Sequence, residues 1–182
     1  MIYHNYNGLT LHIFVIGFAA AADALSWDAW RNRGSNWLTK GLAKWQYGMP
    51  VILICTATVV TYALSGLAKV WSELAWDWAQ GTAMRSQVAS DSIRKIMLGG
   101  EAEPLFGWLF NHTWIFMGMG VMTYLLELGA PLALLHRKIA YGWVSLTLGM
   151  HWGIYFIMGI DFPYQLSGFV FLSFYRLKTF YG

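Results

Sequence analysis

The residues of this chain that could do chemistry are ionisable groups inside apolar segments. Lys69 ends the apolar stretch TYALSGLAKV (61–70), and His12, Glu127 and His151 lie within other apolar stretches. A titratable side chain in hydrocarbon is costly and tends to face a bundle interior, a cavity or a partner. A lysine near a helix end commonly extends to the membrane surface instead. Two interpretations of Lys69 are therefore open: a snorkelling cation and a reactive group.

Other kinds of reactive site have little support in the sequence. The histidines are scattered over different segments without HxxxH or ExxH spacing, and Cys55 is the single cysteine. A metal site needs three or four convergent ligands, so we predict none. Phosphate-binding glycine loops and serine nucleophile elbows are absent from the sequence as well.

The composition indicates an integral membrane protein. Of the 182 residues, 57% are hydrophobic and only 12% are charged, which is far from the balance of a soluble domain. The many Trp, Tyr and Phe side chains fit this class, because amphipathic rings favour the headgroup level. The net charge of +3 follows from loop charges and does not indicate nucleic-acid binding. Membrane lipid is the expected partner.

The hydropathy pattern predicts an all-α fold, a polytopic transmembrane helical bundle forming one domain over residues 1–182. A span needs roughly 20 apolar residues, and five segments approach this length, near 9–27, 49–71, 106–128, 139–160 and 162–178. The loop 72–105 contains the aromatic, amphipathic stretch SELAWDWAQGTAM, followed by a segment with helical spacing. We expect this loop to supply interfacial helix, because it lacks enough apolar material for a separate core.

The distribution of Lys and Arg predicts the orientation. The loop 28–48, the turn 136–138 and the tail after 175 are basic, whereas the loop 72–105 has three basic residues against five acidic ones. The positive-inside rule then places the N-terminus outside, the C-terminus in the cytoplasm and the loop 72–105 on the non-cytoplasmic side. This topology predicts that Asp23 and Glu127 lie toward the inner face. Toward the outer face it predicts His4, His12, Lys69, His112, His151 and Asp161.

The helix that carries Lys69 has one polar face. Tyr62, Ser65, Gly66 and Lys69 are separated by three or four residues, so they lie on the same side of a helix. We expect this side to face the bundle interior, since the alternative exposes a hydroxyl and an amine to acyl chains. Lys69 should then lie within reach of His4 or His151.

Four stretches resemble, in order, the membrane domain of vitamin K-dependent gamma-glutamyl carboxylase, whose bacterial relatives are the horizontally transferred transmembrane domain (HTTM) proteins. They are HNYNGLTLHIFVIGFAAAADALSWDAW, YALSGLAKVW with WAQGTAM, LLELGAPLALL, and GMHWGIYFIMGIDFPYQL. The resemblance covers nearly the whole chain. It implies a bacterial inner-membrane protein, and, because family members carry further helices upstream, a shortened member or a fragment.

The resemblance also implies roles for particular residues. Lys69, in a Gly-x-x-Lys pattern, corresponds to the base that deprotonates reduced vitamin K, and His4, in His4-Asn5-Tyr6, corresponds to an active-site histidine. By this resemblance Lys69 and His4 are candidate catalytic residues. We predict that His151, Tyr6 and Tyr62 bind the cofactor, which by the resemblance is a reduced, vitamin K-like quinone. Partial removal from water favours the neutral amine, which could accept a hydroquinone proton. A neighbouring histidine could donate to the developing oxyanion.

Two functions stay open from the sequence. The first is an enzyme that uses a lysine base on a quinol or another lipid-soluble substrate at the outer leaflet. The second is a non-catalytic structural or accessory subunit of a larger membrane complex, with membrane-protein partners. Carboxylation of a protein substrate is not expected, since the lumenal domain with which the carboxylase engages peptides has no counterpart here. An enzyme requires a pocket that converges on Lys69, whereas a subunit requires a broad helix face complementary to a neighbour.

Overall fold

The structure, a computed structural model, describes residues 6–19, 44–102 and 104–175. Within these ranges the chain is all helical and contains no strand. The elements in chain order are α1 (Asn7–Gly17), α4 (Lys44–Val70), α5 (Ala75–Ala79), α6 (Thr82–Met97), α7 (Phe106–Leu109), α8 (Thr113–Leu128), the 3-10 helix η2 (Ala130–Leu134), α9 (Arg137–Met158), α10 (Pro163–Leu166) and the 3-10 helix η3 (Phe169–Phe174).

For the described residues the structure confirms the all-α fold class, with a candidate membrane span in α4. Over Trp45–Val70 this helix is long and apolar enough to cross a bilayer, and among the described residues it is the single helix that is so by length and composition. Shorter apolar helices are formed by α1 and α8, and α9 has 22 residues. The five-span topology therefore stays a prediction.

The fifth predicted span, 162–178, is not a continuous helix in the residues that are described. Pro163 starts the four-residue α10, and the chain then breaks at Gly168, whose φ of 74° lies in the left-handed region. A 3-10 helix follows to Phe174. A helix cannot pass through a left-handed residue, so the apolar composition of this segment was a poor guide to its conformation. The third span is also shorter than predicted, because α8 begins at Thr113 and α7 is a separate turn.

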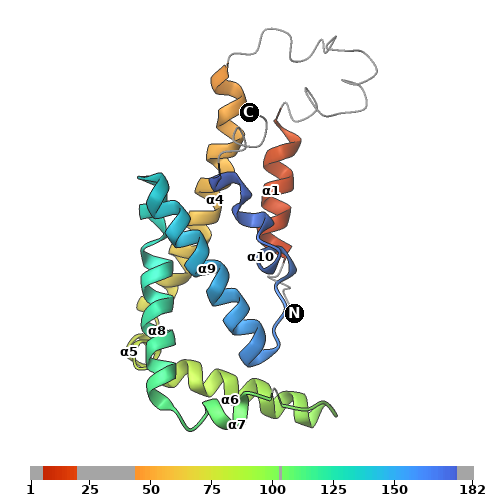
Figure 1. The fold of residues 1–182 in the computed structure, drawn as a ribbon, viewed down its shortest axis with the longest axis vertical. Helices are drawn as coiled ribbons and strands as arrows, with labels where there is room; N and C mark the ends of the chain where they lie inside the picture. The colour runs from red at the N-terminus through yellow and green to blue at the C-terminus, as the bar shows by residue number, and fades with distance from the viewer. Residues whose placement is uncertain (1–5, 20–43, 103, 176–182) are drawn as a thin grey trace.

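The long helices α4, α8 and α9 form the body of the molecule, and α1 lies against α4 (Figure 1). The α10–η3 segment folds back between α1 and α9, and α6 runs across one end of the bundle at a steep angle to the long helices. The larger core cluster is centred on Trp143, whose ring packs edge-on against Phe171 and whose Nε1 donates to the Leu126 carbonyl at 2.9 Å.

A close helix contact between α4 and α8 sets the position of the polar side chains. A Cβ at Gly66 would lie 2.9 Å from the Glu127 Cβ and 3.1 Å from the Leu128 backbone nitrogen. Only a glycine allows this approach, and small residues have the same role where membrane helices pack closely. Lys69 follows Gly66 by three residues, so the contact brings its side chain to the level of Glu127.

The segment 72–105 is helical, as predicted, over most of its length. Its helices α5 and α6 pack against α8, and α6 also packs against α9. The Tyr124 hydroxyl donates to the Ala75 carbonyl at 2.9 Å, and the Lys95 ammonium donates to the Met158 carbonyl. These contacts join the segment to the long helices. Its position at a membrane interface stays a prediction.

Candidate functional site

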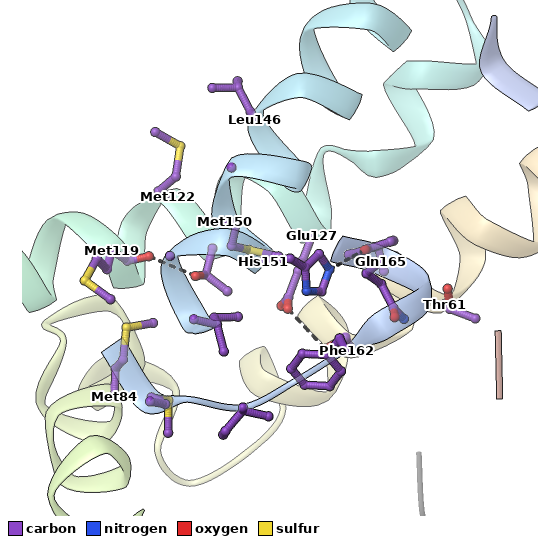
Figure 2. A pocket seen from close by; sticks show the side chains of 18 of the residues that line it. Thr61, Met84, Met119, Met122, Glu127, Leu146, Met150, His151, Phe162 and Gln165 are labelled. Atoms are coloured by element: carbon purple, nitrogen blue, oxygen red, sulfur yellow. Dashed lines mark hydrogen bonds between the residues drawn. The ribbon is translucent and has the colours of Figure 1, made fainter. Parts of the chain in front are cut away.

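A cavity of about 1230 Å³ lies between the helices, with walls from α1, α4, α5, α6, α8, α9, α10 and η3. Most of its lining is apolar and includes Met84, Met119, Met122, Met150, Trp78 and Trp114. Figure 2 shows Met84, Met119 and Met122 toward one side, Thr61 and Gln165 toward the other, and Glu127 and His151 between them. One face of α4 contributes polar lining residues, namely Thr58, Tyr62, Ser65 and Lys69, and other helices contribute more, among them His12, Glu127, His151 and Gln165.

Lys69 and Glu127 form an ion pair on the wall of this cavity. The ammonium is bonded to both carboxylate oxygens, and the side chains are 18% and 7% exposed. The Ser65 hydroxyl also donates to the carboxylate, at 3.2 Å. The Lys69 nitrogen lies 5.1 Å from the centre of the Trp78 ring, at a distance typical of a cation–π contact.

The pairing decides which of the two groups can act as a base. A buried carboxylate is costly without a counter-charge, and its ammonium partner removes most of that cost. While it is bonded in this way, the Lys69 nitrogen has three protons and no free lone pair, so it cannot accept another proton. The Glu127 carboxylate keeps unshared lone pairs. In an ion pair of this kind the carboxylate has the free lone pairs, and the ammonium is a positive charge beside it.

A second polar pair lies on the same face of α4, about two helical turns before Lys69. The Tyr62 hydroxyl and the His151 Nε2 are 2.6 Å apart, and His151 is 8% exposed. Its ring packs edge-on against Phe162, with centroids 5.5 Å apart. The other ring nitrogen of His151, Nδ1, is buried and has no hydrogen-bond partner within the described ranges. Buried polar atoms are normally paired, so this nitrogen calls for an explanation.

His12 connects three helices at the same cavity. Its Nδ1 is 2.6 Å from the Tyr164 hydroxyl and its Nε2 is 3.0 Å from the Thr58 hydroxyl. Both ring nitrogens are thus occupied and the residue is 3% exposed. The arrangement agrees with the structural role that is common for histidines between membrane helices.

The structure brings some of the predicted site residues together at the cavity and places others elsewhere. Lys69, Tyr62 and His151 all line the one cavity, and so does His12. His4 and Asp23 lie outside the described residues. Tyr6 is 52% exposed just before α1 and does not belong to the cavity lining.

Two further residues of the predicted outer group lie away from the cavity. The His112 Nδ1 donates to the Trp108 carbonyl at 2.8 Å, which is a contact within its own turn. Asp161 is exposed and is not part of the cavity lining. Of the predicted outer group, His12, Lys69 and His151 line the same cavity, and their side of the membrane stays a prediction.

The predicted depth of Glu127 was wrong. Loop charges placed Glu127 and Lys69 toward opposite faces, whereas the structure joins them at one level. The reason is that the segment after Lys69 still packs along α8. At Gly120 the two backbones are so close that an added Cβ would meet the Trp78 carbonyl. Lys69 is therefore not at the end of the bundle. The usable signal in the sequence was a lysine and a glutamate in neighbouring apolar helices, which favour pairing with each other.

Comparisons of the chain with protein families, with curated proteins and with solved structures returned no match. The resemblance to the carboxylase membrane domain therefore depends on the sequence motifs alone.

Proposed function

We propose that this chain is a membrane protein that binds a lipid-soluble, hydroxyl-bearing ring compound of the quinol class in the cavity beside Lys69. The observation that carries this proposal is the buried Lys69–Glu127 pair on the wall of a large apolar cavity. Paired ionisable groups buried in membrane helices commonly mark sites of ligand or proton handling.

The size and the lining of the cavity suit such a ligand. Sites for small organic molecules are typically about 300–1,000 Å³, mostly apolar, with a few polar groups that fix orientation. A cavity of about 1230 Å³ has room for a ring and part of an apolar chain. Methionine side chains adapt their shape to irregular apolar ligands, and three of them follow one side of the cavity in Figure 2.

The reaction that we propose is a proton transfer in which Glu127 and Lys69 act together. Glu127 accepts the proton of the ligand hydroxyl, so the O–H bond breaks and a carboxylic acid forms. The Lys69 ammonium, released from its carboxylate, then pairs with the ligand oxyanion. Charge is conserved, because one anion replaces another beside the same cation, and a preorganised cation is an effective stabiliser of such an anion.

The remaining expectations belong to the same proposal. Sequence motifs support membership of the carboxylase-like HTTM family and a location in a bacterial inner membrane. The apolar helix α4 and the loop charges support five spans, an outer N-terminus and an outer-leaflet site. The proposal differs from the sequence-based hypothesis in one respect. The base is Glu127, and Lys69 contributes its charge.

Binding of a chromophoric phenol tests both parts of the proposal. A naphthol with a long alkyl chain changes its ultraviolet absorption when it loses its proton. We expect the purified wild-type protein to bind it and to shift its spectrum toward the deprotonated form. Glu127→Gln should bind it without the shift, because an amide oxygen does not take the proton.

Two results would contradict the proposal. If the wild type does not bind the naphthol, the cavity is not a site for this class of ligand, and the accessory-subunit hypothesis gains support. If Glu127→Gln gives the same spectral shift as the wild type, Glu127 is not the proton acceptor. Ser72→Ala serves as the control, since that hydroxyl donates to the Lys69 carbonyl and is not part of the cavity lining.

A further inference from the structure

One ring nitrogen of His151 has no partner among the residues that the structure describes. The residue is more than nine-tenths buried, its Nε2 is bonded to Tyr62, and none of the described residues bonds its Nδ1. The same side chain lines the cavity beside Lys69. An unmade hydrogen bond of a buried group is costly, so a molecule in the cavity is the natural source of the missing partner.

The Tyr62 contact determines which nitrogen of His151 carries the proton. In the part of the chain that the structure describes, the Tyr62 hydroxyl has His151 Nε2 as its hydrogen-bond partner, and Tyr62 is partly buried. If Nε2 carried the hydrogen, the phenol hydrogen would have no acceptor among these residues. The arrangement that satisfies both groups within the protein has Tyr62 as the donor to Nε2. In a neutral imidazole the other nitrogen then carries the hydrogen, so Nδ1 is an N–H donor that needs an acceptor.

The donor and the ion pair belong to one ligand site. Glu127 on α8 and His151 on α9 both line the cavity, and Figure 2 shows the two side chains in its central part. Tyr62, which holds His151, is one helical turn before Gly66, which packs against Glu127. His151 and Glu127 are thus held at neighbouring turns of α4, and both line the same cavity.

We propose that the His151 Nδ1–H binds a second oxygen of the ligand whose hydroxyl meets Glu127 and Lys69. The proposal rests on the proposed function and specifies its ligand: a ring with a hydroxyl at one edge and an acceptor oxygen at the opposite edge, as in a 1,4-hydroquinone. Tyr62 is a positioning residue, because it sets the tautomer of His151 and does not itself meet the ligand oxygen.

Two chain-matched ligands and two matched variants test the proposal. The ligands are a long-chain 1,4-hydroquinone and the corresponding phenol without the second oxygen. Their binding to the purified protein is measured by quenching of tryptophan fluorescence, since Trp78 and Trp114 line the cavity. We expect the wild type to bind the hydroquinone roughly tenfold more tightly, the usual effect of one well-made hydrogen bond.

The variants test the two ring nitrogens of His151 one at a time. His151→Gln can keep an acceptor for Tyr62 but has no group in the position of Nδ1, so the preference for the hydroquinone should disappear. His151→Asn carries an amide nitrogen near the position of Nδ1, so it should keep part of the preference. Tyr62→Phe should lower the preference, because Nδ1 is then no longer fixed as the donor. A merely structural role of His151 would change both affinities and leave their ratio unchanged.

The outcomes distinguish this proposal from the proposed function. Equal binding of the two ligands by the wild type, or an unchanged ratio in His151→Gln, would overturn the second contact and leave the Glu127–Lys69 site standing. If the wild type binds neither ligand, the proposed function fails, and the second contact fails with it. Gly142→Ala is a control on α9, because Gly142 is not part of the cavity lining and nothing lies within 4 Å of the added Cβ.

Discussion

Lys69 and Glu127 join α4 to α8 through an ion pair that is almost withdrawn from solvent. The two residues are 58 positions apart in the sequence, and the glycine contact at Gly66 is what brings them to the same level. The pair thus has two consequences. It holds two helices together, and it places a carboxylate and a counter-cation on the wall of an apolar cavity.

Removal of one partner of this pair should destabilise the protein more than removal of both. Lys69→Met leaves a buried carboxylate alone, and Glu127→Leu leaves a largely buried ammonium. Each should cost about 3 kcal/mol, whereas replacing both groups by apolar ones should be close to neutral. Thermal unfolding of the purified variants, followed by circular dichroism, measures the order. Additive losses in the double variant would show that the two charges do not depend on each other.

The close contact at Gly66 should be equally sensitive to a single methyl group. Gly66→Ala forces a Cβ against the Glu127 side chain and the Leu128 backbone, and overpacking of this kind costs about 1–3 kcal/mol. Gly142→Ala is the matched control, because nothing lies within 4 Å of the added Cβ and alanine favours a helix. A loss of stability for Gly142→Ala as large as that for Gly66→Ala would contradict the importance of the α4–α8 approach.

The inward face of α4 is the part of the site that was predictable from the sequence. Spacings of three and four residues between Tyr62, Ser65, Gly66 and Lys69 depend on helical geometry alone, and α4 is a continuous helix there. Tyr62, Ser65 and Lys69 accordingly line the cavity. A local pattern is sufficient in this case, because burial of polar groups in an apolar setting constrains the direction of a helix face.

The partners across the cavity were not predictable in the same way. His12 meets Tyr164 over 152 positions, and Glu127 meets Lys69 at a depth that loop charges do not report. Such contacts depend on where each helix begins and ends. The Gly168 break and the late start of α8 at Thr113 shift those limits away from the apolar composition. Hydropathy reports the free energy of transferring residues from water. It does not report at which level the side chains of two neighbouring helices meet.

His12 provides a prediction that separates architecture from ligand binding. Its imidazole joins α1 to Thr58 on α4 and to Tyr164 on α10, so His12→Leu should remove two hydrogen bonds and lower stability by roughly 1–3 kcal/mol. Because both nitrogens are already occupied by protein groups, the preference for a hydroquinone over a phenol should not change. A changed ratio of the two affinities would make His12 part of the ligand site.

The last prediction concerns α8, which is the critical helix for the five-span topology. Its 16 residues extend about 24 Å at 1.5 Å per residue, which is less than the roughly 30 Å of a hydrocarbon core. If α8 nevertheless crosses the membrane, residues before and after it must face opposite sides. The acidic character of the loop 72–105 and the basic turn at 136–138 predict that Glu101 is outside and Lys138 is inside.

Cysteine labelling in intact cells measures this directly. In a Cys55→Ala background, Glu101→Cys should react with a membrane-impermeant maleimide without permeabilisation, and Lys138→Cys should react only after it. Both residues are exposed, so a lack of labelling before permeabilisation reports the side of the membrane and not burial. If both cysteines react from one side, α8 enters and leaves the membrane through the same face. The pair Lys69–Glu127 would then lie in a re-entrant hairpin, and the orientation derived from loop charges would have to be rejected.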